Sequence, residues 1–574
     1  MAEPNPIVAP AADLHTGTRD TEDVPNEIVV PPPEPKLGWL GLLLAMFPTF
    51  GGIMFGYDAG YISGVLAMDQ FKKTFGSPGH LQVEAFEGYL YSSSQKSLIT
   101  SILSAGTFFG ALSAGYFNDK LGRRATIILG TTLYCIGCAL QVASSSIGLL
   151  AAGRAVAGLG IGIANSAIIL YTSEVTPKNI RGRVLSLYQW AITIGLLIAA
   201  CVNEGTKNLS NSAAYRIPMG LQFAWALILL IGMCVLSESP RWYVMKGRNA
   251  DATKSLCKLR SQPAHSEFVQ REVAELTQSL QDEIDQGAGS GSWLDCFRGG
   301  WKCGSNLQLT LLGMGIQMMQ QLTGVNFIFY YGTTFFTRAG ISNPFIIQLV
   351  VNVVNVVTTP ATFFIVDRAG KWSGRRGLLL IGSTGMAICQ LLVALVNSTA
   401  DSSASKIILI VFTCINIAFF AITWGPVGWT VIGEIYPLPI RSRGVSLATA
   451  SNWFWNFALS FSAPYIVDEG YGDIGGNVFY IFAGFCALAL VLVFFCVWET
   501  KNLSLENVNV MVKDVKPRKS VAWNEKHQNN ARPAGNAEMA TVTGTDSAAQ
   551  NSGFFKNMFR SKTARSVDSR KSSQ

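Results

Sequence analysis

The sequence predicts an all-α membrane protein with twelve transmembrane helices in two pseudo-symmetric bundles of six. Three observations support this fold class. Apolar windows of about 20 residues, the length that spans a bilayer core, recur about twelve times along the 574 residues. Charged residues make up 14% of the chain, against about 25% in soluble domains. Motifs of the first half return in the second half at an offset of 260 residues.

The elements follow one another in a regular order. Residues 1–36 are polar, which predicts a disordered N-terminal tail without a cleavable signal peptide. We expect residues 37–237 to form the first bundle, residues 238–306 a cytosolic linker with short helices, and residues 307–498 the second bundle. The expected spans are 38–61, 97–118, 125–146, 148–171, 183–204, 216–237, 307–331, 344–366, 377–397, 406–432, 444–467 and 476–498.

The last segment, 499–574, is predicted to be a basic cytosolic tail. Residues 511–574 hold twelve basic and five acidic residues, so nearly all of the formal charge of +8 belongs to this tail. Its composition predicts disorder from residue 511 onward. Because no basic stripe lies on a folded element, we expect no nucleic-acid partner.

The orientation follows from the short loops between the spans. With the N-terminus placed in the cytosol, the inner loops hold twelve Lys and Arg residues and the outer loops hold six. This bias predicts that both termini are cytosolic.

An internal repeat relates the two halves. Glu174-x-x-Pro177-x-x-x-Arg181 recurs as Glu434-x-x-Pro437-x-x-x-Arg441. Two equivalent halves are typical of a transporter whose binding site lies between them and opens alternately to each side.

Enzymatic chemistry has no sequence support. We find no metal-ligand cluster, no nucleophile–base pair and no nucleotide motif, and therefore expect no catalytic residue, cofactor or metal. The glycines around Arg154 lie within an apolar span, and we interpret them as sites of close helix packing.

Carboxamide side chains gather in the predicted spans, where an unsatisfied polar group is costly and indicates function. Each carboxamide donates and accepts hydrogen bonds, as adjacent sugar hydroxyls do, and Trp424, Trp429 and Tyr330 offer flat apolar surfaces for C–H faces. The alternative is that these amides only tie helices together.

Asp58 and Arg154 are the acid and the base that lie well within predicted spans. Both fall on the outer side, because the first span runs outward and the fourth runs inward. We therefore predict that they pair and that Asp58 carries a proton, since no histidine lies in a predicted span. The alternative is a salt bridge that only joins two helices.

Nine motifs carry a resemblance over residues 51–506. They are FGYDAG, GYFNDKLGRR, GRAVAGLGIG, YTSEVTPKNIRG, SESPRW, QQLTGVNFIFYYG, WGPVGW, GEIYPLPIRSRG and WETKNLSLEN. In these motifs the chain resembles the sugar porter family of the major facilitator superfamily, and most closely the fungal monosaccharide transporters.

The resemblance implies the major facilitator fold and a monomer that takes up a monosaccharide, a hexose such as glucose, by proton symport across the plasma membrane. A facilitative hexose uniporter and a non-transporting sugar sensor on the same fold remain alternatives. The resemblance assigns proton coupling to Asp58 and Arg154. The expected sugar-binding residues are Gln189, Gln320, Gln321, Asn326, Tyr330, Asn355, Trp424, Trp429 and Asn452.

Charges at the inner ends of the spans form a second predicted set. In transporters that the chain resembles, such charges bridge the two halves in the outward-open state; the alternative is that they only signal topology. The expected inner-gate residues are Asp119, Arg123, Arg124, Glu174, Arg181, Glu238, Arg241, Arg375, Arg376, Glu434 and Arg441.

Overall fold

The structure is a computed structural model that describes residues 39–78, 86–285, 292–338, 344–367, 374–399, 403–467 and 474–530. In these ranges the secondary structure is helical, apart from two isolated bridges, Ser77–Leu90 and Phe86–Tyr89. The predicted all-α class is therefore confirmed. The tail expected over residues 1–36 lies outside the described residues.

The N-terminal half contains long, mostly unbroken helices. Ser92 begins the second span with a capping box, in which its hydroxyl accepts from the N–H of Gln95 and the Gln95 side chain accepts from the N–H of Ser92. The elements are α1 (Trp39–Met46), η1 (Phe47–Phe50), α2 (Gly51–Ala67), α3 (Asp69–Phe75), α4 (Ser93–Leu121), α5 (Arg123–Val142), α6 (Ile147–Val175), α7 (Arg181–Thr206) and α8 (Ala213–Val235).

Short helices occupy the stretch between the two halves. They are α9 (Pro240–Met245), α10 (Asn249–Arg260), α11 (Glu267–Asp285) and η2 (Trp293–Phe297). The guanidinium of Arg260 lies 2.7 Å from the carboxylate of Glu272, so an ion pair joins α10 to α11.

Breaks interrupt three spans of the C-terminal half. Gly324, with a φ of +77°, separates α12 from α13, since few other residues adopt this angle. Pro360 separates α14 from α15, and Thr423 separates α17 from α18. The elements are α12 (Asn306–Leu322), α13 (Val325–Arg338), α14 (Pro344–Thr358), α15 (Ala361–Ile365), α16 (Arg375–Thr399), α17 (Ser403–Ile422), α18 (Trp424–Glu434), α19 (Leu438–Val467), η3 (Gly475–Asn477) and α20 (Val478–Cys496).

Ten helical stretches among the described residues are long and apolar enough to cross a membrane. The predicted seventh and eleventh spans are not among them. The seventh is divided into α12 and α13, and the eleventh, α19, carries arginines and asparagines along its length. With these two, the described helices supply twelve crossings, and the two polar crossings carry most of the expected sugar-binding amides.

Small residues let the helices of the first half approach closely. A Cβ atom added to Gly158 would lie 2.1 Å from the carbonyl oxygen of Leu103, and one on Gly160 would lie 2.4 Å from the backbone nitrogen of Tyr134. Real Cβ contacts are never so short, so α6 can pack between α4 and α5 only with glycine at these positions. The interpretation of these glycines as packing sites is confirmed.

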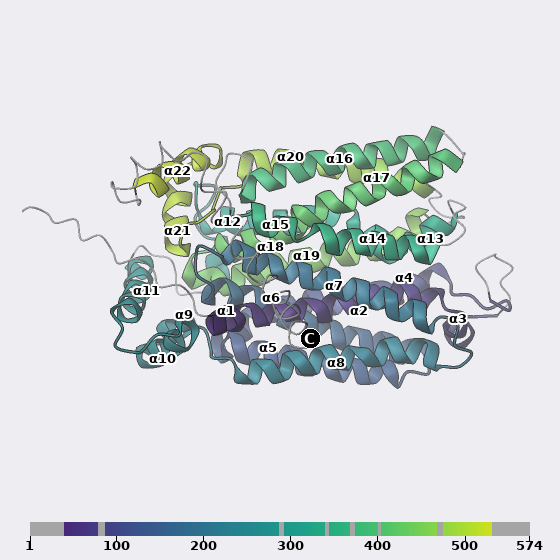
Figure 1. The fold of residues 1–574 in the computed structure, drawn as a ribbon, viewed down its shortest axis with the longest axis horizontal. Helices are drawn as coiled ribbons and strands as arrows, with labels where there is room; N and C mark the ends of the chain where they lie inside the picture. The colour runs from purple at the N-terminus through teal and green to yellow at the C-terminus, as the bar shows by residue number, and fades with distance from the viewer. Residues whose placement is uncertain are drawn as a thin grey trace, which may run out of the picture. The chain divides into compact units, whose positions relative to one another are not determined.

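Figure 1 shows α9, α10 and α11 at the same end of the long helices as α21 (Leu505–Asp514) and α22 (Ser520–Asn530), and α3 at the opposite end. We call the end that carries α9, α10, α11, α21 and α22 the linker end. The short η4 (Pro517–Lys519) connects α21 to α22. The predicted disorder from residue 511 is therefore wrong for residues 511–530, and residues 531–574 lie outside the description.

Candidate functional site

Carboxamides of α12 and α19 form a connected hydrogen-bond network in the C-terminal half. The side-chain nitrogen of Asn452 donates to Gln317 Oε1 at 2.6 Å and to Gln320 Oε1 at 2.8 Å. The nitrogen of Gln321 donates to Asn452 Oδ1 at 2.9 Å. Asn326 at the start of α13 donates to Gln321. The break after α12 places Asn326 beside the amides of the preceding helix.

Asn456 extends this network to the other half of the molecule. Its nitrogen donates to Gln321 Oε1 at 3.0 Å and lies 3.3 Å from the Tyr330 hydroxyl. Its oxygen accepts from the hydroxyl of Ser104 on α4, at 2.6 Å. The carboxamide network therefore reaches the interface between the halves.

Sequence reasoning did not assign Gln317 and Asn456 to the site. Gln317 precedes Gln320 and Gln321 by three and four residues, and Asn456 follows Asn452 by four, so each lies on the same helix face as a predicted residue. This periodicity is a signal that could have found both.

Gln189 and Asn355 stand apart from the network. Gln189 on α7 packs against the break in the tenth span, where a Cβ atom on Gly425 would lie 3.2 Å from its Cδ. Gln320 donates to the carbonyls of Trp424 and Gly425 at the same break, at 2.8 and 3.0 Å. Asn355 is fully buried on α14, and its two amide atoms have no hydrogen-bond partner within the described ranges.

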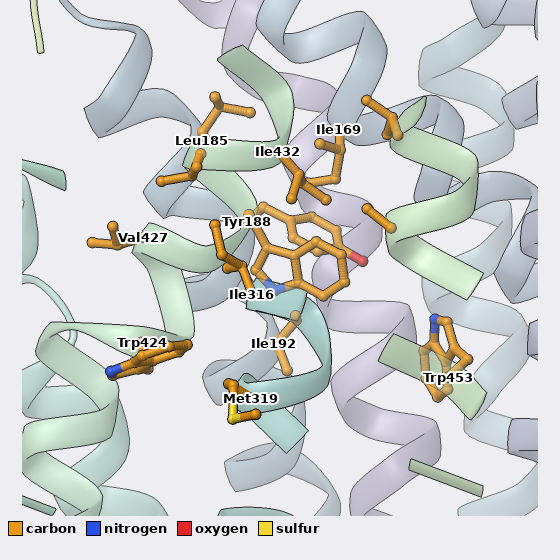
Figure 2. Packing of buried hydrophobic residues seen from close by; sticks show 14 of the residues in the cluster. Ile169, Leu185, Tyr188, Ile192, Ile316, Met319, Trp424, Val427, Ile432 and Trp453 are labelled. Atoms are coloured by element: carbon orange, nitrogen blue, oxygen red, sulfur yellow. The ribbon is translucent and has the colours of Figure 1, made fainter. Parts of the chain in front are cut away.

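Of the expected aromatic residues, Trp429 packs across the interface between the halves, whereas Trp424 is buried within the second half. Figure 2 shows Tyr188 of α7 near Ile316 of α12 and Ile432 of α18. The ring of Trp429 meets that of Tyr188 edge to face, with centroids 5.8 Å apart. The Trp424 indole N–H donates to Ser383 Oγ at 2.9 Å, and its ring is buried. Both tryptophans are buried in the apolar core.

Asp58 and Arg154 lie side by side in the N-terminal half, as predicted. Arg154 Nη1 is 3.5 Å from Asp58 Oδ1, and both side chains are at most 1% exposed. The same nitrogen donates to the Tyr61 hydroxyl at 2.7 Å, which in turn donates to Gln141 Oε1 at 2.5 Å. The Asp58 oxygens have no hydrogen-bond partner in the described part of the chain. The ion pair with Arg154 is thus the main compensation for burying this carboxylate.

The expected inner-gate charges form two equivalent clusters at the linker end. In the first half, Arg123 pairs with Glu174 at 2.9 Å, and the Ser239 hydroxyl donates to Glu174 at 2.5 Å. In the second half, Arg375 pairs with Glu434 at 2.8 Å, and the Thr500 hydroxyl donates to Glu434 at 2.6 Å. These ion pairs lie within one half each. The expectation that these four charged residues bridge the halves in the outward-open state stays a prediction.

Two loop carboxylates cap the helices that carry these arginines. Glu238 accepts from the backbone N–H groups of Arg123 and Arg124, which begin α5. Glu499 accepts from those of Arg375 and Arg376, which begin α16. Burial raises the pKa of both carboxyl groups, although these donors and the adjacent arginines act in the opposite direction. Each carboxylate satisfies amide groups that a helix start leaves unpaired.

Other charges join the two halves. Asp119 lies 2.9 Å from the guanidinium of Arg443, and Asp367 lies 3.6 Å from that of Arg183. Arg183 and Arg443 each follow the repeat arginine by two residues, so the two bridges are related by the internal repeat. Sequence reasoning assigned only Asp119 of these four residues to the gate.

Three further arginines form an ion pair and hydrogen bonds at the linker end. Arg241 on α9 pairs with Glu506 on α21. Burial raises the pKa of Glu506, but the Arg241 charge and hydrogen bond outweigh it, with help from Arg441, and lower the pKa to about 2. Arg181 donates to the carbonyl of Leu503 at 3.4 Å, and Arg441 donates to that of Tyr436 at 2.9 Å.

Comparison with known proteins identifies this arrangement. The profile described as "Sugar (and other) transporter" matches residues 44–512. A major facilitator-type transporter of Aspergillus rugulosus is 42% identical over 84% of this chain and 90% of its own length. A probable glucose transporter of Neurospora crassa is 43% identical, over 83% and 79%. A high glucose sensor of Saccharomyces cerevisiae is 39% identical, over 85% of this chain and 62% of the sensor.

Solved structures agree in fold. The proton:xylose symporter XylE bound to 6-bromo-6-deoxy-D-glucose has a TM-score of 0.71 at 25% identity and covers 82% of this chain and 99% of its own. Inward-open XylE from E. coli has a TM-score of 0.60. With a profile match over most of its length and relatives above 40% identity, the chain belongs to the sugar transporter family of the major facilitator superfamily.

Proposed function

We propose that this protein is a plasma-membrane monosaccharide transporter that takes up a hexose such as glucose together with a proton, by alternating access. Membership of the sugar transporter family supports sugar transport, and the named relatives include a probable glucose transporter and a proton:xylose symporter. In this proposal the protein works as a monomer, and its linker end and both termini face the cytosol.

The carboxamide network is the proposed sugar site. It presents donors and acceptors from α12, α13 and α19 at the interface between the halves. Sugar hydroxyls can replace the amide–amide bonds one for one, because each hydroxyl donates and accepts. Gln189 and Asn355 complete the site from α7 and α14, and Trp424, Trp429 and Tyr330 supply its apolar walls.

One observation carries the proton-coupling part of the proposal: the buried Asp58 carboxylate is paired with Arg154 and accepts no hydrogen bond from the described residues. A proton on Asp58 removes the charge that Arg154 compensates. Among the described residues Arg154 then keeps its hydrogen bond to Tyr61, and α2 and α6 lose an electrostatic contact. We infer that this loosening lets the first half close over bound sugar.

Uptake of labelled glucose by a cell without its own hexose transporters tests the proposal. We expect accumulation above the external concentration, which an uncoupler abolishes. Asp58→Asn mimics the protonated form and should lose accumulation while retaining exchange of sugar across the membrane. Asp69→Asn, which removes a half-exposed carboxylate on α3, is the matched control and should accumulate normally.

The other outcomes distinguish the alternatives. Uptake that reaches but never exceeds the external concentration, and that ignores the uncoupler, indicates a uniporter. Absence of uptake by protein at the cell surface indicates a sensor, the role for which the yeast relative is named. An Asp58→Asn protein that still concentrates glucose with proton dependence would exclude Asp58 as the coupling residue.

A further inference from the structure

A cavity of about 280 Å³ lies between the two halves, away from the carboxamide network. We call it the interbundle cavity. Its walls come from α2 and α7 of the first half and from α13 and α14 of the second. Its volume is near the lower end of the range of about 300–1,000 Å³ typical of small-molecule sites.

The cavity lies on the same helix faces as two proposed sugar-binding residues. Asn352 and Gln348 precede Asn355 by three and seven residues, so all three follow one face of α14. On α7, Asn203 follows Gln189 by fourteen residues, close to four full turns. The cavity therefore lies about one turn of α14 beyond Asn355 and about four turns of α7 beyond Gln189, on the side away from the linker end.

Acceptor atoms without partners line the cavity. Asn203 and Asn352 are each 3% exposed, and their side-chain oxygens, like Gln348 Oε1, have no hydrogen-bond partner among the described residues. The nitrogen of Asn203 donates to the Tyr61 carbonyl at 3.0 Å, which fixes this amide. Buried acceptors of this kind are costly unless a donor reaches them.

The other side chains that line the cavity indicate which class of ligand fits it. The hydroxyl of Ser63 adds a group that donates and accepts, and Phe329 adds an aromatic ring. The carboxylate of Glu204 is already paired with Lys207 at 2.6 Å, so a cation is not the matching ligand. A small neutral molecule with several O–H donors and an apolar C–H face satisfies every one of these groups.

We propose that the interbundle cavity is a second monosaccharide-binding site, which sugar occupies before it reaches the carboxamide network. This inference rests on the proposed sugar transport and adds a separate site to it. Sugar hydroxyls donate to Asn203, Gln348 and Asn352 there, and the next step along α14 brings the sugar to Asn355.

A cysteine reporter tests occupancy of this site in the full-length protein. Ala200 lines the cavity through α7 and contributes no polar group. We expect glucose at about four times its dissociation constant to slow modification of Ala200→Cys by a small hydrophilic thiol reagent about fivefold, because bound sugar blocks the thiol in the occupied fraction of the protein. Peptide mass spectrometry follows residue 200. The exposed native Cys201 next to it is the matched control, and its modification should not change.

Two variants distinguish binding in the interbundle cavity from binding at the carboxamide network. In Gln320→Ala, which weakens the carboxamide network, glucose should still protect residue 200. In Asn352→Ala protection should disappear, whereas Asn416→Ala, which removes a buried amide of α17 outside the cavity lining, should retain it. If Gln320→Ala folds poorly, Gln321→Ala provides the same background.

Three results bear on the proposal in different ways. Protection that survives Gln320→Ala and is lost in Asn352→Ala supports it. Protection that is lost in Gln320→Ala would assign all sugar binding to the carboxamide network and would overturn the proposal. A wild-type protein that transports glucose yet shows no protection at residue 200 also overturns it, whereas absence of transport and protection together counts against the proposed function itself.

Discussion

At the scale of single residues, the expected sugar-binding amides differ in what they do without sugar. Gln320 makes three hydrogen bonds, two to the backbone of α18 and one with Asn452. Asn355 makes none with the described residues although it is fully buried. Gln320 thus stabilises the fold as well as facing the proposed site, whereas Asn355 is a buried polar group that no described residue satisfies and that a ligand can.

This difference gives a matched pair of variants. Loss of one partner of a buried hydrogen bond costs about 1–3 kcal/mol, so Gln320→Ala and Asn355→Ala should each raise the half-saturation concentration for glucose roughly five- to 150-fold. Gln320→Ala should also lower the apparent melting temperature, and Asn355→Ala should leave it unchanged or raise it. Uptake kinetics and thermal melts of the purified proteins measure the two effects. Wild-type half-saturation in either variant would remove that residue from the site.

The Arg241–Glu506 pair predicts a pH dependence of stability. The folded-state pKa of Glu506 is about 2, below its ordinary value of 4.5. A lowered acid pKa stabilises the fold above the unfolded-state value and loses this effect as the pH falls through the folded-state value. The contribution is therefore full above pH 4.5 and declines between pH 4.5 and 2.

Glu506→Gln tests this dependence. We expect the wild type to melt at a higher temperature than the variant from pH 7 to 5, and the difference to shrink as the pH falls below 4.5. Glu525→Gln removes an exposed acid from α22 and serves as the control for net charge. A difference that stays constant down to the lowest measurable pH would contradict the assignment of this ion pair.

At the scale of elements, α22 packs against the loop at Glu499 and hydrogen-bonds to it. The buried Ser520 hydroxyl accepts from the backbone N–H of Glu499 at 3.0 Å, and Asn524 donates to the carbonyls of Glu499 and Lys501 at 3.1 and 2.9 Å. The Arg518 guanidinium lies over the ring of Phe495, 4.3 Å from its centroid. Because Glu499 caps α16, α22 supports the cluster around Arg375.

Two truncations test this support. Composition alone predicts that a chain ending at Lys513 transports normally. The structure predicts that this truncation lowers thermal stability and slows uptake, because it removes these three hydrogen bonds and the one that the Trp498 indole N–H donates to the Val515 carbonyl at 2.7 Å, each worth about 0.5–1.5 kcal/mol. A chain ending at Asn530 keeps α22 and should match the wild type. Equal behaviour of the two truncations, measured by surface expression, thermal melting and initial uptake rate, would refute a role for α22.

At the scale of the whole molecule, the internal repeat produces two equivalent bridges across the interface. Asp119 of the first half meets Arg443 of the second, and Asp367 of the second meets Arg183 of the first. Both lie at the linker end. The contact between the rings of Tyr188 and Trp429 also joins the halves. An opening at this end must separate both bridges, so their strength influences which conformation is populated.

Neutralising one bridge should favour opening at the linker end. Ser446 of α19 is buried against α4, since a Cβ atom on Gly115 would lie 3.3 Å from its hydroxyl. We expect Ser446→Cys to react several-fold faster with an impermeant thiol reagent in inside-out vesicles when Asp119→Asn is present. The Arg443→Gln background should give the same increase, and combining both should add little, because they break one bridge. Additive effects would show that the two residues act independently.

Several features could be predicted from the residues alone: the helical class, the twelve spans, the location of the amides within them and the pairing of Asp58 with Arg154. These features depend on hydropathy and on helical spacing, which are local properties. The pairing was predictable because few charged residues lie within the spans, so each had few possible partners.

Which helix faces meet could not be predicted from the residues and follows from the packing of the helices. Arg123 and Glu174 pair inside one half, although they resemble residues that bridge two, because the approach of α5 to α6 and not the motif sets their distance. The order of residues 511–530 arises from contacts with the loop at Glu499, which composition does not register. The interbundle cavity likewise exists because two bundles leave a gap between faces that are far apart in the chain. Such contacts depend on helix orientation, and a single helix sequence does not encode its neighbour.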